Sequence, residues 1–161
     1  MEWVYDDGGR SKYFKAKNVG DCVCRAIAIG TGLDYKEVYD ELQKRAKGET
    51  TTQLKHHRRG KRSNARNGVF KETWKEYLFD LGWVKHSTCG FGKGVQCHLV
   101  TDELPMGTII VQVSKHLVCV IDGVIHDTYN SSITQYYDWN GTGELITNDR
   151  RAVYSYWTKE K

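Results

Sequence analysis

Apolar residues recur every three to four positions in three stretches of the first half of the chain, which is the spacing of a helix with one buried face. The first stretch follows Asp21 and predicts a helix over residues 22–31. The second follows Asp34, a favourable N-cap residue, and ends before Gly48. The third follows a basic segment and ends before Gly82. The first half of the chain is therefore predicted to be mainly helical.

The pattern changes in the second half to short apolar runs, the last of them alternating with polar residues, and these runs predict strands. These runs cover residues 108–113, 116–121, 124–129 and 151–157. Asp122-Gly123 separates the second run from the third, and this dipeptide between two apolar runs is a strong signal for a two-residue hairpin turn. Helices followed by strands predict an α+β domain in which N-terminal helices pack on a C-terminal antiparallel sheet.

The remaining segments give weaker patterns. Residues 3–5 are predicted to be extended, followed by a turn and a second extended piece at 13–14. Residues from about 50 to 68 have no apolar period and predict a mobile loop, and residues 85–98, rich in Gly and Cys, give no assignment. We expect one domain over residues 1–161.

Composition places the chain among globular proteins. Hydrophobic residues make up 39 % of the 161 residues and aromatic residues 12 %, which is too much apolar content for a disordered chain. The five cysteines are an odd number, which argues against a disulfide framework. The acidic N-terminus lacks the pattern of a signal peptide, and no run approaches the roughly 18 apolar residues of a membrane span. We therefore expect free thiols, a cytoplasmic location and no membrane contact.

One cluster of bases accounts for the net charge of +4. No acidic residue lies between Thr50 and Lys71, and the bases of that segment outnumber the whole surplus. The segment is a candidate site for an acidic partner. Its basic part, from Lys55 to Arg66, lacks an aromatic residue that could stack on bases, so nucleic acid is the weaker candidate partner. The candidate binding residues of this basic loop are Lys55, Arg58, Arg59, Lys61, Arg62 and Arg66.

The hairpin turn determines which polar residues share a face. With Asp122-Gly123 as the turn, Ile121 pairs with Val124, and the register then places His116 and Asp127 on the same face as diagonal neighbours. Such neighbours lie roughly 7–8 Å apart at the backbone, so the carboxylate can reach the imidazole. An imidazole held by a carboxylate is half of a nucleophilic triad.

Cys22 is the candidate for the other half, because it is the first residue after the N-cap of the first predicted helix. A helix N-terminus stabilises a thiolate, and its backbone N–H groups can also hold an oxyanion during acyl transfer. A cysteine at this position is more often a small core residue, so the argument depends on the combination of Cys22, His116 and Asp127.

Two segments resemble a known family. Residues 20–26 read Gly-Asp-Cys-Val-Cys-Arg-Ala and are followed by Thr-Gly at 31–32 and Tyr-x-x-Val at 35–38, a pattern that resembles small phage-encoded proteins of the papain-like superfamily. That superfamily includes the bacteriocin-processing peptidases. Residues 116–127 resemble its His-strand-turn-strand-Asp segment. The resemblance implies a papain-like cysteine peptidase with Cys22 as nucleophile, His116 as base and Asp127 as orienting acid.

The oxyanion donor departs from the family pattern. Papain-like enzymes usually supply a Gln several residues before the nucleophile, and here the candidates are Asn18 and Asp21. Asn18 precedes Cys22 by four residues and Cys24 by six, and the longer spacing is nearer the papain pattern. Cys24 therefore stays open as an alternative nucleophile.

The favoured function is a thiol hydrolase that acts on a peptide, isopeptide or related amide in the cytoplasm of a phage host. The alternative is an inactive papain-like protein that captures a host protein or nucleic acid through the basic loop. No cofactor is expected. The spacing of Cys89, Cys97 and His98 relative to the first two cysteines matches no zinc signature, so no metal is predicted either.

Overall fold

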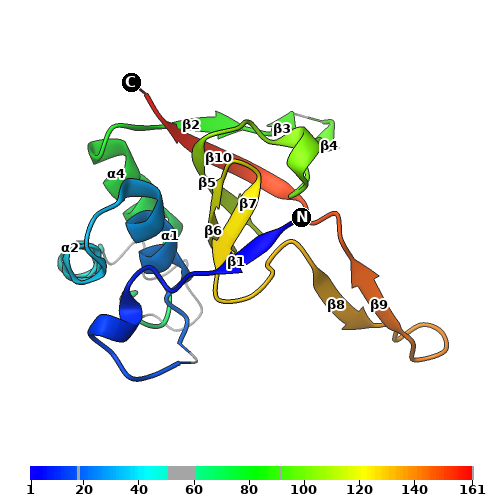
Figure 1. Ribbon diagram of the computed structural model, residues 1–161, viewed down its shortest axis with the longest axis horizontal. Coiled ribbons are helices and arrows are strands. Elements are labelled where there is room, and N and C mark those ends of the chain that lie inside the picture. The colour runs from blue at the N-terminus through cyan, green and yellow to red at the C-terminus, as the bar shows by residue number, and fades with distance from the viewer. Residues whose placement is uncertain (18, 51–60, 91, 161) are drawn as a thin grey trace.

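A six-stranded sheet with helices packed on one face forms the body of the protein (Figure 1). The computed structural model describes residues 1–17, 19–50, 61–90 and 92–160. The strand order is β1-β7-β6-β5-β10-β2, and all neighbours are antiparallel except the pair β1 and β7. The predicted α+β class is confirmed. The strands are β1 (Trp3–Tyr5), β2 (Trp83–Ser87), β5 (Thr108–Val113), β6 (His116–Ile121), β7 (Val124–Asp127) and β10 (Val153–Lys159).

The predicted hairpin between β6 and β7 is confirmed in both turn and register. Asp122 and Gly123 have φ values of 48° and 79°, as a tight hairpin turn requires of both central residues. Ile121 pairs with Val124, and Val120 pairs with Ile125. Strand β7 ends at Asp127, two residues earlier than the pattern predicted.

The helices α1 (Cys22–Thr31), α2 (Tyr35–Lys47) and α4 (Lys71–Asp80) correspond to the three predicted helices. The Asp34 side chain caps α2 by accepting a hydrogen bond from the backbone N–H of Lys36. A short 3-10 helix, η1 (Arg10–Lys12), precedes residues 13–14, for which the structure has no strand. A second one, η2 (Thr101–Glu103), precedes β5.

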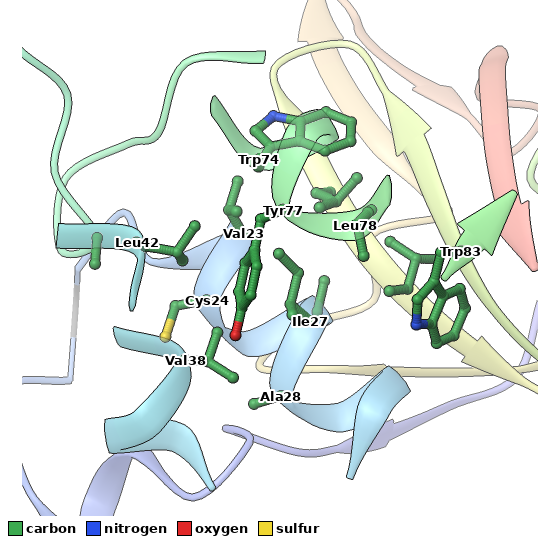
Figure 2. Packing of buried hydrophobic residues seen from close by; sticks show 14 of the residues in the cluster. Val23, Cys24, Ile27, Ala28, Val38, Leu42, Trp74, Tyr77, Leu78 and Trp83 are labelled. Atoms are coloured by element: carbon green, nitrogen blue, oxygen red, sulfur yellow. The ribbon is translucent and has the colours of Figure 1, made fainter. Parts of the chain in front are cut away.

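Both faces of the sheet are covered, which explains why its central strands are almost continuously apolar. The helix-side core gathers side chains from α1, α2 and α4 around Ile27, Leu42 and Leu78 (Figure 2). A second core on the opposite face includes Leu99 and Ile125.

Helix α1 lies very close to the sheet, mainly against β6. A Cβ added at Gly30 would come 2.9 Å from side-chain atoms of Ile110 on β5, so a larger residue would require Ile110 to shift. The close packing brings the N-terminal end of α1, with Cys22, toward the start of β6, where His116 lies.

Two small hairpins lie outside the sequence prediction. Strands β3 (Cys89–Gly90) and β4 (Gly94–Val95) fall in the unassigned segment 85–98, together with most of β2. Strands β8 (Thr134–Tyr137) and β9 (Leu145–Asn148) form a hairpin that projects from the body (Figure 1). No helix among the described residues is long and apolar enough to cross a membrane.

The described end of the basic loop is held by hydrogen bonds, unlike the mobile loop that the sequence predicted. Ser63 donates to Glu49 through its backbone N–H, at 2.7 Å, and through its hydroxyl. The backbone N–H of Ala65 donates to Gln43, and Ala65 itself is only 1 % exposed. Ser63 and Ala65 are therefore anchored to Glu49, two residues after α2, and to Gln43 on α2. Ala65 is a single short apolar residue within a polar segment, so no periodicity predicts that this part of the loop is anchored.

Candidate active site

Cys22 and His116 line one cavity of about 180 Å³ on the helix side of the sheet. Cys22 is the first residue of α1 and is partly buried. His116 is the first residue of β6, and its side chain is 7 % exposed. Apolar residues complete the walls, among them Val69, Trp74 and Leu117. The cavity gives a small substrate group access to the thiol.

His116 and Asp127 form a close pair across the hairpin. Nε2 of His116 lies 2.6 Å from Oδ2 of Asp127. Because the Asp127 carboxyl is ionised, Nε2 carries the donated hydrogen. Nδ1 is then left for interactions with Cys22 and with the Tyr129 hydroxyl, which lies 3.4 Å from it. Burial disfavours the charged imidazole, yet the hydrogen bonds and charges of Asp127 and Cys22 outweigh it and raise the pKa of His116 to about 9.

The thiol of Cys22 is shifted toward its ionised form. Burial raises its pKa, but the hydrogen bond and charge of His116, the backbone N–H of Leu117 and the charge of Arg25 together bring the pKa below the ordinary thiol value. The same balance holds for Asp127, whose pKa is lowered by His116 and Arg25 against the effect of burial. These directions favour a thiolate–imidazolium pair over a neutral thiol and imidazole.

Asp21 has a different role from the one expected. It occupies the N-cap position of α1, but its side chain makes no capping hydrogen bond. Its Oδ1 accepts from Nη1 of Arg10, at 3.0 Å, and from Nη1 of Arg25, while Oδ2 accepts from the hydroxyl of Tyr35 at 2.6 Å. A carboxylate with both oxygens occupied by donors cannot donate to an oxyanion. The prediction of Asp21 as an oxyanion donor is therefore wrong.

The other oxyanion candidate, Asn18, lies outside the described residues.

Arg25 links this buried cluster to the pair on the hairpin. Its Nη2 donates to Oδ1 of Asp127 at 3.0 Å, while its Nη1 binds Asp21. Arg25 is 5 % exposed. One planar guanidinium thus holds the acid behind His116 in place, and it does so from the same helix that carries Cys22. The sequence signal for this role is the i, i+4 spacing of Asp21 and Arg25 on a buried helix face.

Cys24 does not lie in this cavity. Its side chain is fully buried in the helix-side core (Figure 2), where its sulfur lies 3.7 Å from the backbone carbonyl oxygen of Tyr35. Burial is the main cause that raises the pKa of Cys24 to about 12. A helical step of two residues turns the side chain to another face of α1. The alternative of Cys24 as nucleophile is therefore wrong.

Gln112 is a cavity residue that sequence reasoning missed. It is 6 % exposed and lies on β5 opposite Leu117, and both residues line the cavity. Its Oε1 accepts a hydrogen bond from the Ser155 hydroxyl at 2.9 Å. Within the described structure Nε2 of Gln112 has no hydrogen-bond partner. This nitrogen is not fully enclosed, so it retains access to solvent. A polar residue in an apolar strand run was its only sequence signal.

Tyr129 covers His116 from the outside. The two ring centroids lie 5.3 Å apart, and the Tyr129 hydroxyl lies 3.4 Å from Nδ1 of His116. Strand β7 ends at Asp127, so Tyr129 lies beyond the hydrogen-bonded ladder of the hairpin. The chain after β7 nevertheless places Tyr129 against the imidazole ring of His116.

The structure describes only part of the predicted basic loop. Lys61, Arg62 and Arg66 are exposed, whereas Lys55, Arg58 and Arg59 lie outside the described residues. Among the residues that the structure describes, no group of three or more His, Cys, Asp or Glu side chains could hold a metal ion.

Comparison with known proteins adds no relative: no protein-family model, curated protein or solved structure matches the chain.

Proposed function

We propose that this protein is a papain-like thiol hydrolase in which Cys22 is the nucleophile, His116 the general base and Asp127 the orienting acid. The observation that carries the proposal is the place of His116 between an acid and a thiol, because His116 bonds Asp127 and lines the same cavity as Cys22. Its Nε2 bonds the Asp127 carboxylate at 2.6 Å, while its interaction with Cys22 lowers the pKa of that thiol. A base fixed on one side and a sensitised nucleophile on the other is the arrangement that acyl transfer requires.

The reaction would proceed in two steps. The Cys22 thiolate attacks the carbonyl carbon, a C–S bond forms, and the carbonyl oxygen takes the negative charge. The imidazolium of His116 then gives its proton to the leaving nitrogen as the C–N bond breaks, which leaves an acyl-enzyme. In the second step His116 takes a proton from water, the hydroxide displaces Cys22 from the acyl carbon, and a carboxylic acid is released.

Two groups are available for the charged oxygen. The first-turn N–H groups of α1 have no side-chain cap, so they can face an anion beside Cys22. Nε2 of Gln112 is an amide donor whose oxygen is already held by Ser155. Donors that are fixed before the reaction stabilise an oxyanion without reorganisation. Gln112 therefore takes the role that the sequence assigned to Asn18 or Asp21.

The substrate class follows from the chemistry as a peptide, isopeptide or related amide. All five cysteines are unpaired, in keeping with a reducing compartment, and we place the protein in the cytoplasm of a phage host. An intact Cys22–His116–Asp127 arrangement favours the hydrolase over an inactive binding protein, because a decayed site would be under no constraint to keep the imidazole between the acid and the thiol.

Limiting iodoacetamide at pH 7, followed by mapping of the modified cysteines, tests the proposal. An ordinary thiol is only a few per cent ionised at that pH, so we expect Cys22 to be alkylated about tenfold faster than the exposed Cys89. His116→Ala should remove this preference. The matched control is His126→Ala, because His126 lies on β7 and pairs with Asp6 at 3.1 Å.

The control should leave the labelling of Cys22 unchanged. Equal labelling of Cys22 and Cys89 in the unmodified protein, or full labelling of Cys22 in His116→Ala, would contradict the proposal.

A further inference from the structure

Two hollows share His116 and Lys115 as lining residues, and the charged lining residues of both are all basic. The cavity that contains Cys22 is lined by Lys71 and Lys115 in addition to His116. The second hollow, a trough of about 460 Å³, is lined by His116, Lys115 and Arg151 together with polar and aromatic residues. No Asp or Glu of the described chain lines either hollow. A ligand that passes His116 therefore meets positive charge on both sides.

The basic surface continues beyond the cavity along α4. Lys71 and Lys75 are four residues apart and share one face of that helix. Lys75 lies 5.7 Å from the ring centroid of Trp74, which is itself a wall of the cavity. Lys85 on β2 pairs with Trp157, whose ring centroid lies 4.9 Å from that of Trp74. Lys71 and Lys75 thus lie near Trp74 at the cavity, and Lys85 lies beside Trp157 on the neighbouring strand.

These lysines lack acidic neighbours in ion-pair range. None of Lys71, Lys75, Lys85 and Lys115 forms an ion pair within the described structure. The pKa of Lys75 is lowered by burial and then by the charges of Lys85 and Lys71, and the opposite influence of Glu72 does not compensate. By contrast, Arg45 on α2 binds Glu41 and Asp80. Among the described residues, the mutual repulsion of these lysines is only partly offset by Glu72, and an anionic ligand would relieve it.

We propose that the substrate is a peptide with acidic residues on both sides of the bond that Cys22 attacks. One group of carboxylates would lie along Lys71, Lys75 and Lys85. The other would meet Arg151, whose guanidinium is held in place by the backbone carbonyls of Ser131, at 3.0 Å, and Ser114, at 2.6 Å. The inference rests on the proposed function, because an acyl-transfer site calls for a peptide and not for a nucleic acid.

Binding to the Cys22→Ala variant tests the inference without turnover. Two fluorescent peptides of equal length are compared by anisotropy at low salt, one with Glu on both sides of a central Gly and one with Gln at the same positions. Exposed charge pairs contribute about 0.2–1 kcal/mol each, so several pairs predict about tenfold tighter binding of the Glu peptide. The preference should shrink as salt is added.

Variants that remove positive charges show which lysines cause the preference for the Glu peptide. Lys71→Gln combined with Lys75→Gln should reduce the preference for the Glu peptide to about twofold. The matched control, Lys44→Gln combined with Lys47→Gln, removes two exposed lysines from α2 and should leave the preference unchanged. Equal affinity for the two peptides would overturn the inference, and so would an equal loss in the control.

A polyanion surface would give a different result. An oligodeoxythymidine of the same charge should bind at least about tenfold more weakly than the Glu peptide, and equal or tighter binding would overturn the inference. Because these measurements use a chain without the nucleophile, their failure leaves the alkylation result intact. Loss of selective alkylation with intact acidic-peptide binding would instead contradict the proposed function, and the basic surface would then bind acidic peptides without cleaving them.

Discussion

Replacing Arg25 with Met removes the one side chain that joins the two buried acids of the site. Arg25 is 5 % exposed, and the side chains of its partners Asp21 and Asp127 are 0 % and 3 % exposed. Removing one partner from a buried ionic group leaves uncompensated charge and costs about 3–5 kcal/mol. Within the described structure Arg25 Nε has no hydrogen-bond partner, so its removal also relieves one unsatisfied donor. We therefore take the lower end, about 3 kcal/mol.

Urea unfolding followed by tryptophan fluorescence measures this loss. For a domain of this size each kcal/mol lowers Tm by about 2–4 °C, so a parallel thermal scan should show a drop of about 6–12 °C. The matched control is Arg150→Met, because the Arg150 side chain is 57 % exposed where it pairs with Glu103. An exposed pair of this kind contributes about 0–1 kcal/mol.

Arg25→Lys separates charge from geometry. A lysine keeps the positive charge but cannot bind Asp21 and Asp127 through two nitrogens at once, so its stability should fall between those of the unmodified protein and the Met variant. A loss in Arg25→Met no larger than in Arg150→Met would refute the reasoning, because it would mean that the acids do not depend on the guanidinium.

Two further predictions concern the chemistry at Cys22. The pKa of Cys22 is lowered and that of His116 is raised to about 9. The release of p-nitrophenolate from p-nitrophenyl acetate should therefore rise with pH through the lowered thiol pKa and fall again above about pH 9. A rate that first appears only above pH 9 would contradict the ion pair. The corresponding contribution of His116 to stability is complete below its unfolded pKa of about 6.5 and is lost as pH rises through about 9. Gln112→Met should slow ester acylation by about 10²-fold and leave the rate of iodoacetamide alkylation within about twofold, because only acylation develops an oxyanion. Equal effects on both rates would show that Gln112 is not the oxyanion donor.

The sequence by itself determined the parts of the site that depend on local structure. The Asp122-Gly123 turn and the period of two along β6 and β7 were enough to place His116 beside Asp127, because a hairpin register leaves no freedom once the turn is known. The apolar period and the glycines likewise located α1, with Cys22 at its start.

Only the tertiary structure decided what each polar residue near that start contacts. Asp21, Cys22 and Cys24 are neighbours in sequence, but the turn of the helix directs one to Arg10 and Arg25, one to His116 and one into the core. Gln112 comes from a strand about ninety positions away. Contacts of this kind depend on how a helix packs on a sheet, and that packing is the sum of many small apolar contacts that no local pattern encodes.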